Sequence, residues 1–151
     1  LAGCALLAVV IFSMAIADKH RTLGGQIWGV IGLSAPCLPI LLGGEISPAV
    51  AVVLWGTWLL GFASTTMAVR GVIAAQKRQS RVIHWSALVA ISITVAALAA
   101  AGFRKPIVTL PMLAMAWYLV AAPPPAQQLK RVGWTLVAGT VVSAIWMVLE
   151  Q

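Results

Sequence analysis

The chain has 151 residues, of which 62% are hydrophobic and 9% are charged, and its formal net charge is +7. Soluble domains carry about 25% charged residues, so this composition leaves too little polar surface for a soluble globule and excludes that class. No basic domain stands outside the apolar runs, which argues against a nucleic-acid-binding protein. The composition therefore predicts an integral membrane protein.

Six apolar runs follow one another along the chain. A bilayer core of about 30 Å needs roughly 20 helical residues, and these runs lack the residue alternation of a membrane barrel. The sequence predicts an all-α fold, a polytopic transmembrane helix bundle of about six membrane spans that forms a single transmembrane helical domain. The predicted spans are residues 1–17, 23–42, 48–69, 82–102, 107–122 and 132–149.

The first run is a little short for a full span, and it ends at Asp18-Lys19-His20-Arg21. The chain begins with Leu rather than Met, so we expect that an N-terminal part is lacking. In the second run Gly25, Gly29 and Gly32 fall on one helical face, where small residues let a neighbouring helix approach closely. Pro36 and Pro39, near the far end of this run, are expected to kink or break the helix.

The third run, residues 48–69, carries no charge and leads into a basic stretch, Arg70–Arg81, with the sequence RGVIAAQKRQSR. Clustered Lys and Arg mark a cytoplasmic loop under the positive-inside rule. Eight of the ten Lys and Arg fall on that side of the predicted topology, and only Arg104 and Lys105 fall on the other. We therefore expect a multi-pass protein with cytoplasmic basic loops and an external C-terminus.

The fifth run is interrupted by Pro111, and a polar connector, PPPAQQLKR at residues 123–131, leads to the sixth run. Tryptophans occupy the predicted cytoplasmic ends of four spans, as an interfacial aromatic belt does. They are Trp28, Trp85, Trp117 and Trp134.

Little in the sequence indicates catalysis. His20 and His84 both map to the cytoplasmic membrane edge, and two histidines on different helices can bind a haem. Asp18 is the only carboxylate on that side, whereas a divalent-cation site needs several oxygen ligands. The simpler interpretation is that both histidines are interfacial polar residues and that Asp18 pairs with Lys19 or Arg21 or is solvated. Cys4 and Cys37 form no metal-binding spacing, so we predict no catalytic residue, no metal site and no cofactor.

The basic residues at the predicted cytoplasmic ends of the spans indicate a binding function more clearly than the histidines and Asp18 indicate a haem or metal site. Arg70 ends one span and Arg81 begins the next, so both are expected at the membrane edge, where arginine can grip a phosphate through two donors. We predict a cytoplasm-facing cavity, walled by spans two, three, four and six, that binds an amphiphile with an anionic head and an apolar tail. The predicted ligand-binding residues are Arg70, Arg81, His84, Trp85, Lys130 and Arg131. The alternative is that these residues only anchor the topology.

Three stretches resemble the YwiC-like family of bacterial membrane proteins: IADKHRTLGGQIWGVIG at Ile16–Gly32, WLLGFASTTMAVRGVIAAQKR at Trp58–Arg78, and LKRVGWTLVAG at Leu129–Gly139. In that family an N-terminal half with a Pro-Arg-Glu-His-Gly-type motif precedes these spans. The resemblance therefore implies a C-terminal part of a longer protein of the bacterial plasma (inner) membrane. It implies no particular biochemical activity.

The chain is also distantly similar to UbiA-type prenyltransferases, whose Asp-rich motifs hold a Mg²⁺-diphosphate. Only Asp18 is available in the comparable loop, which argues against that chemistry. The leading prediction is a membrane protein that binds or handles a lipid-like or amphiphilic anionic molecule at its cytoplasmic face, with membrane lipids and their anionic head groups as partners. A UbiA-like intramembrane prenyltransferase and a haem- or quinone-associated respiratory subunit stay open as alternatives.

Overall fold

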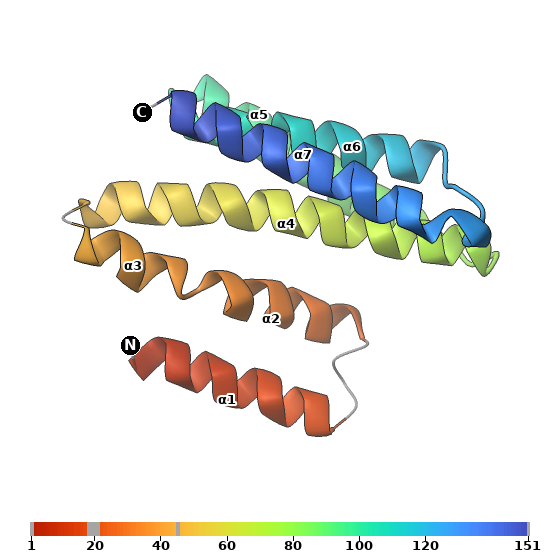
Figure 1. Ribbon diagram of the computed structural model, residues 1–151, viewed down its shortest axis with the longest axis horizontal. Coiled ribbons are helices and arrows are strands. Elements are labelled where there is room, and N and C mark those ends of the chain that lie inside the picture. Colours follow the sequence, from red (N-terminus) through yellow and green to blue (C-terminus); the bar gives the residue numbers. More distant parts are fainter. Residues whose placement is uncertain (1, 18–21, 45, 151) are drawn as a thin grey trace. The chain divides into compact units, whose positions relative to one another are not determined.

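The computed structural model of the protein describes residues 2–17, 22–44 and 46–150 (Figure 1). Within these ranges every regular element is a helix and no strand occurs, so the all-α prediction is confirmed. The elements are α1 (Ala2–Ile16), α2 (Leu23–Ser34), α3 (Cys37–Gly43), α4 (Pro48–Gln76), α5 (Val82–Ala100), the 3₁₀ helix η2 (Lys105–Thr109), α6 (Leu110–Ala121), the 3₁₀ helix η3 (Ala126–Gln128) and α7 (Leu129–Leu149).

Four apolar segments are long enough to cross a membrane: Gly24–Gly43, Pro48–Gln76, Val82–Ala100 and Ala126–Leu149. Two other apolar segments, Ala5–Met14 and Lys105–Ala121, are shorter. At about 2.0 Å per residue in its 3₁₀ part and 1.5 Å per residue in its α-helical part, the second of these reaches about 28 Å, slightly less than the hydrocarbon core of about 30 Å. The described residues thus contain four helical segments of spanning length, and the predicted number of six is not confirmed.

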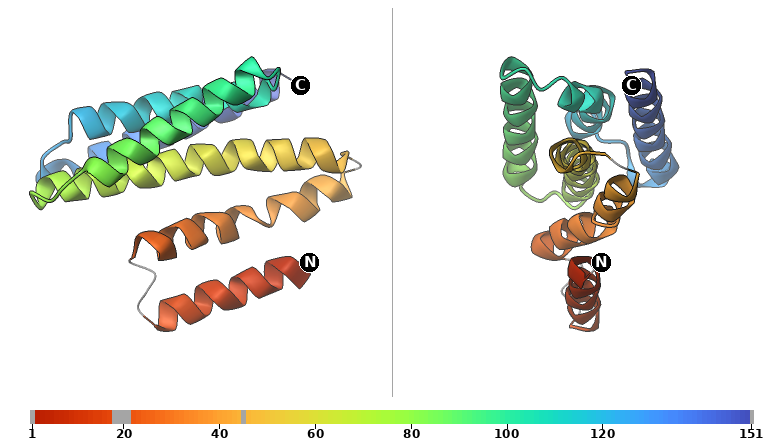
Figure 2. Two further views of the ribbon diagram at one scale, coloured as in Figure 1. Left: turned by 180° about the vertical axis from the view of Figure 1, so that it is seen from behind. Right: turned by 90° about the vertical axis from the view of Figure 1, so that its left-hand side faces the viewer.

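The chain divides into two compact units, which we call unit 1 (Leu1–Leu59) and unit 2 (Leu60–Gln151). In unit 1 the predicted second span is broken between α2 and α3 (Figure 2). Pro36 has no backbone N–H and therefore cannot continue the helical hydrogen bonds, which confirms the expected break. The Ser34 hydroxyl at the break donates to the Ile31 carbonyl (3.0 Å) and accepts from the Trp55 indole N–H of α4 (3.0 Å).

The close approach of α1 and α2 also lies in unit 1. A Cβ added at Gly32 would collide with the Ile11 side chain, whereas nothing lies within 4 Å of one added at Gly29. The glycine face of α2 therefore lets α1 approach closely at Gly32, one helical turn beyond Gly29.

In α4 the helix continues seven residues past Val69, the predicted end of the third span, to Gln76. The first part of the basic stretch is therefore helical, because residues 70–76 contain no proline and four of the seven, two alanines, an arginine and a glutamine, are good helix formers. The helix ends in a Schellman motif: Gln79 N–H donates to the Ala74 carbonyl (2.8 Å) and Arg78 N–H to the Ala75 carbonyl (3.1 Å). Arg78 takes the left-handed conformation (φ 54°) that glycine usually supplies there.

In unit 2, α5, α6 and α7 are grouped around the C-terminal part of α4 (Figure 2). Helix α4 meets α6 at two glycines: a Cβ at Gly61 would lie 2.6 Å from Met112 Sδ, and one at Gly71 would lie 3.0 Å from Val120 Cγ2. Met112 and Val120 are fully buried. The core of unit 2 therefore lies on the inner face of α6.

The predicted interruption at Pro111 takes a different form. Pro111 lies in the first turn of α6, directly after η2. A proline loses no hydrogen bond there, because the first N–H groups of a helix have no intrahelical partner. The fifth apolar run therefore starts as a 3₁₀ turn and becomes an α-helix at Leu110.

Candidate functional site

One end of unit 2 brings together the last turns of α4 and α6 and the first turns of α5 and α7. Three hydrogen bonds join these segments: Gln76 Nε2 to the Pro124 carbonyl (3.2 Å), Arg81 Nη1 to the Val120 carbonyl (2.9 Å), and Arg131 Nη2 to the Tyr118 hydroxyl (2.8 Å). We call this region the basic end, because it also carries Arg70, Lys77, Arg78 and Lys130.

The positive charge of the basic end has no carboxylate near it in the sequence. Residues 46–149 contain no Asp or Glu at all. Glu150 follows α7, about 30 Å along that helix from Lys130, where its backbone carbonyl accepts from Lys105 Nζ (3.0 Å). Any carboxylate counter-ion of the basic end therefore comes from outside residues 46–149.

Arg81 caps helix α6. The Val120 carbonyl is one of the last carbonyls of α6, and the residue four positions later is Pro124, which has no N–H to donate. The Arg81 guanidinium supplies that missing donor, and its charge is favourable at the negative end of the helix dipole. Arg81 therefore has a structural role in addition to any contact with a ligand.

His84 and Arg70 lie near each other, behind the surface of the basic end. His84, in the first turn of α5, is only 6% exposed, and its Nδ1 makes no hydrogen bond within the described part of the chain. Gly71 of α4 lies against it, since a Cβ there would be 3.5 Å from His84 Cβ. The half-buried Arg70 is close enough for its charge to act on the imidazole. These two residues belong to the contact of α4 with α5.

Trp85 packs against Trp117 of α6. The two rings meet edge to face, with centroids 5.2 Å apart and an interplanar angle of 61°. The Trp117 indole N–H donates to the Ser92 hydroxyl of α5 (3.1 Å). This aromatic pair therefore joins α5 to α6, and Trp85 has a packing role in addition to any contact with a ligand.

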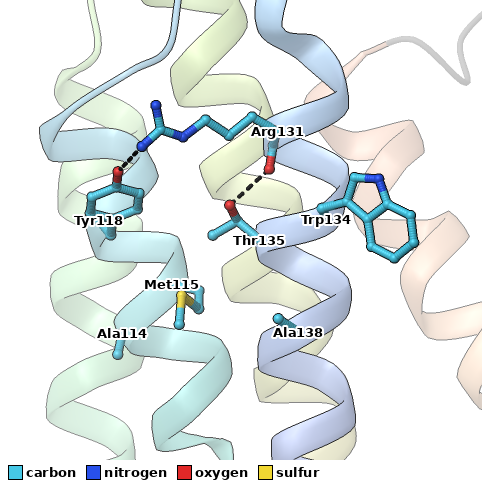
Figure 3. Close-up of a pocket in the computed structure, with 7 residues that line it drawn as sticks. All are labelled: Ala114, Met115, Tyr118, Arg131, Trp134, Thr135 and Ala138. Atoms are coloured by element: carbon cyan, nitrogen blue, oxygen red, sulfur yellow. Dashed lines mark hydrogen bonds between the residues drawn. The ribbon is translucent and has the colours of Figure 1, made fainter.

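An open groove of about 620 Å³ lies between α6 and α7 (Figure 3). This volume falls within the range of small-molecule sites, roughly 300–1,000 Å³. The groove is lined mostly by apolar atoms, with alanines at its sides and polar groups toward the basic end. Its lining residues are Ala114, Met115, Tyr118, Arg131, Trp134, Thr135 and Ala138.

The groove has the form of a wedge. At its narrow end α6 and α7 touch, because a Cβ at Gly139 would lie 3.2 Å from the Pro111 carbonyl oxygen and 3.3 Å from Met112 Cα. At its wide end the Arg131 side chain reaches across from α7 to the Tyr118 hydroxyl of α6 (Figure 3). The wedge therefore opens toward the basic end, with a guanidinium and a phenol at its mouth.

The structure places the six predicted ligand-binding residues at the basic end but separates their roles. Arg131 alone lines the groove, and Lys130 is an exposed neighbour of it. The groove is walled by the fifth and sixth predicted spans rather than by spans two, three, four and six, and that larger cavity stays a prediction. Sequence reasoning missed Tyr118, although it is the only tyrosine of the chain and stands near the end of an apolar run.

Among the described residues no group of three or more His, Cys, Asp or Glu side chains could hold a metal ion. Asp18 and His20 lie outside the described residues. No family model, no curated protein and no solved structure matches this chain. The resemblance to YwiC-like proteins, the distant similarity to UbiA-type enzymes and the respiratory-subunit alternative therefore stay predictions.

Proposed function

We propose that the protein is an integral membrane protein that binds an amphiphilic anion at its basic end. The apolar part of the ligand lies in the α6–α7 groove, and its charged head lies against Arg131. One observation carries this proposal: a mostly apolar wedge opens beside a guanidinium, in a stretch of sequence without a carboxylate. The proposal includes six membrane crossings, a bacterial plasma membrane location and a cytoplasmic basic end.

Once the hydrocarbon chain has placed the ligand in the membrane, the head group has to provide most of the remaining affinity for the site. A hydrocarbon chain gains little by moving from lipid into the groove, because lipid tails are as apolar as the groove walls. A hydrogen bond to a charged group contributes about 1.5–3 kcal/mol, or roughly 10- to 150-fold in affinity. Arg131 is exposed, so the lower part of that range applies. The groove then decides which chain fits and where it lies, and Arg131 decides how tightly the ligand binds.

The basic end adds a longer-range attraction. Each Lys or Arg near an anionic membrane surface contributes about 1 kcal/mol, and the basic end has several of them. Arg81 uses one of its N–H donors for the hydrogen bond to α6, but its positive charge still acts on an approaching anion. The same cations that favour a cytoplasmic location under the positive-inside rule therefore also concentrate an anionic ligand near the mouth of the groove.

Filling the groove tests the proposal. Ala138→Leu puts a larger side chain into the wedge, whereas Ala97→Leu makes the same change at an exposed alanine of α5 outside it. Binding of a dansyl-labelled fatty acid to the full chain in nanodiscs of zwitterionic lipid is measured by fluorescence. Occlusion of the wedge should prevent the ligand from lying with its head against Arg131 and should therefore weaken binding by about tenfold, equivalent to about 1.4 kcal/mol. Equal binding by the two variants would show that the ligand does not occupy this groove.

A further inference from the structure

The pair of polar groups at the mouth of the groove has unused donors. The Tyr118 hydroxyl accepts one hydrogen bond from Arg131 Nη2 (2.8 Å), which leaves its own O–H free to donate to another group. Arg131 has four further N–H donors in its planar fork. Tyr118 is 45% exposed and lines the open groove, so its side chain is accessible to a ligand there. Arg131 and Tyr118 thus present donors from two different helices to the same point.

This arrangement suits a tetrahedral anion better than a planar one. A carboxylate offers two oxygens in one plane, and one edge of a guanidinium satisfies both. A phosphate monoester offers three terminal oxygens, so two can accept from Arg131 while the third accepts from the Tyr118 O–H. We infer, building on the proposed function, that the ligand of the groove is a single-chain amphiphile with a phosphate monoester head, and that Tyr118 sets the preference for phosphate.

The shape of the groove indicates a single chain. The lining residues on α7 extend from Arg131 to Ala138, a length of about 10 Å at 1.5 Å per residue. The contact at Gly139 closes the wedge beyond that point. Two helices with small side chains between them leave room for the head-proximal part of one chain, and the rest of that chain continues into the surrounding lipid. The groove offers no second surface against which another acyl chain on the same head group could pack.

Three ligands with the same oleoyl chain separate the possible heads: lysophosphatidic acid carries a phosphate monoester, oleic acid a carboxylate, and lysophosphatidylcholine a zwitterion. Each competes with the dansyl-labelled fatty acid on the full chain in nanodiscs. Glycerol phosphate, which has the head but no chain, is the fourth competitor. The unsubstituted protein is compared with three variants. Tyr118→Phe removes the O–H and keeps the ring, and Arg131→Lys keeps the charge but loses the planar set of guanidinium donors. Ala97→Leu is the control.

We expect lysophosphatidic acid to bind most tightly of the four. Tyr118→Phe should weaken its binding by about 2- to 10-fold, as the loss of one hydrogen bond does, and should leave oleic acid unchanged. Arg131→Lys should weaken both. Thermal unfolding of Tyr118→Phe, followed by circular dichroism, checks that the variant is folded.

Several outcomes would overturn the inference. The first is equal binding of lysophosphatidic acid and oleic acid, and the second is an equal effect of Tyr118→Phe on both. The third is binding of lysophosphatidylcholine as tight as that of lysophosphatidic acid. The fourth is competition by glycerol phosphate at the same concentration as lysophosphatidic acid. The first two leave the proposed function standing if Ala138→Leu still blocks binding, whereas the third would show that the site does not require an anion and the fourth that it does not require a chain. If Ala138→Leu and Ala97→Leu bind every ligand alike, the proposed function itself fails.

Discussion

Replacing Gly139 by alanine tests how closely α6 and α7 pack. The new Cβ would lie 3.2 Å from the Pro111 carbonyl oxygen, 3.2 Å from Met115 Cγ and 3.3 Å from Met112 Cα. Two of these three atoms belong to the backbone of α6 and cannot rotate away, so the two helices must separate by a few tenths of an ångström. Gly133 lies in the same helix, and nothing is within 4 Å of a Cβ added there.

The two glycines predict opposite effects of the same substitution. Alanine is better than glycine inside a helix by about 0.8–1 kcal/mol, so Gly133→Ala should stabilise the protein by about that amount. At Gly139 the same gain is opposed by overpacking, which costs about 1–3 kcal/mol. The result there should range from no change to a loss of about 2 kcal/mol of unfolding free energy. The difference between the variants isolates the packing term, because helix propensity contributes equally to both.

Unfolding of the full chain in mixed micelles measures both effects, with the fraction of denaturing detergent raised stepwise and helicity followed by circular dichroism. Met115→Ala in the Gly139→Ala background should restore only part of the stability, because the two backbone contacts remain. If Gly139→Ala and Gly133→Ala shift the transition equally and in the same direction, α6 and α7 are not in contact at Gly139.

Three further predictions concern the basic end and the topology. Arg81→Ala removes the donor to the Val120 carbonyl and should lower the free energy of unfolding by about 1–2 kcal/mol, because a hydrogen bond and a favourable interaction with the helix dipole are both lost. Amide hydrogen exchange measures this effect, and it should become faster in the last turn of α6 and stay unchanged in α5. Arg78→Gly relieves a left-handed residue and should raise the unfolding free energy by about 1 kcal/mol, whereas a lower value would contradict the strain. With the native cysteines replaced, Gln79→Cys in intact cells should resist an impermeant thiol reagent and Ser47→Cys should react, and the reverse labelling would overturn the orientation.

Much of the helical structure was predictable because it depends on local properties of the chain. Apolar runs of sufficient length become helices wherever backbone groups cannot bond to water, and a proline inside such a run removes a donor. The break at Pro36 follows directly from this. The clustering of basic residues at one end of unit 2 was also predictable, since alternate connections of antiparallel helices lie on the same side.

The helix faces were not predictable, because a helix that is apolar all round has no polar side to distinguish its outer face from its packed face. Nothing in the sequence distinguishes Gly139, which meets the backbone of α6, from Gly133, which meets nothing within 4 Å. The groove between α6 and α7 was missed for the same reason. The role of Arg81 was not predictable either, because it depends on where α6 ends relative to Pro124. The composition of an apolar run does not determine the residue at which its helix ends.

Adjacent residues of α7 connect the stability of unit 2 with the proposed site. Successive residues of a helix point about 100° apart, so Gly139 faces the backbone of α6 while Ala138 lines the groove. Alone, Gly139→Ala should change stability with little effect on binding, and Ala138→Leu should do the reverse. Together they should interact: if Gly139→Ala moves the helices apart, the wedge widens and the leucine has more room. The double variant should therefore bind the dansyl-labelled fatty acid more tightly than Ala138→Leu alone. Strict additivity in the double-mutant cycle, within about 0.5 kcal/mol, would show that the contact at Gly139 does not control the width of the groove.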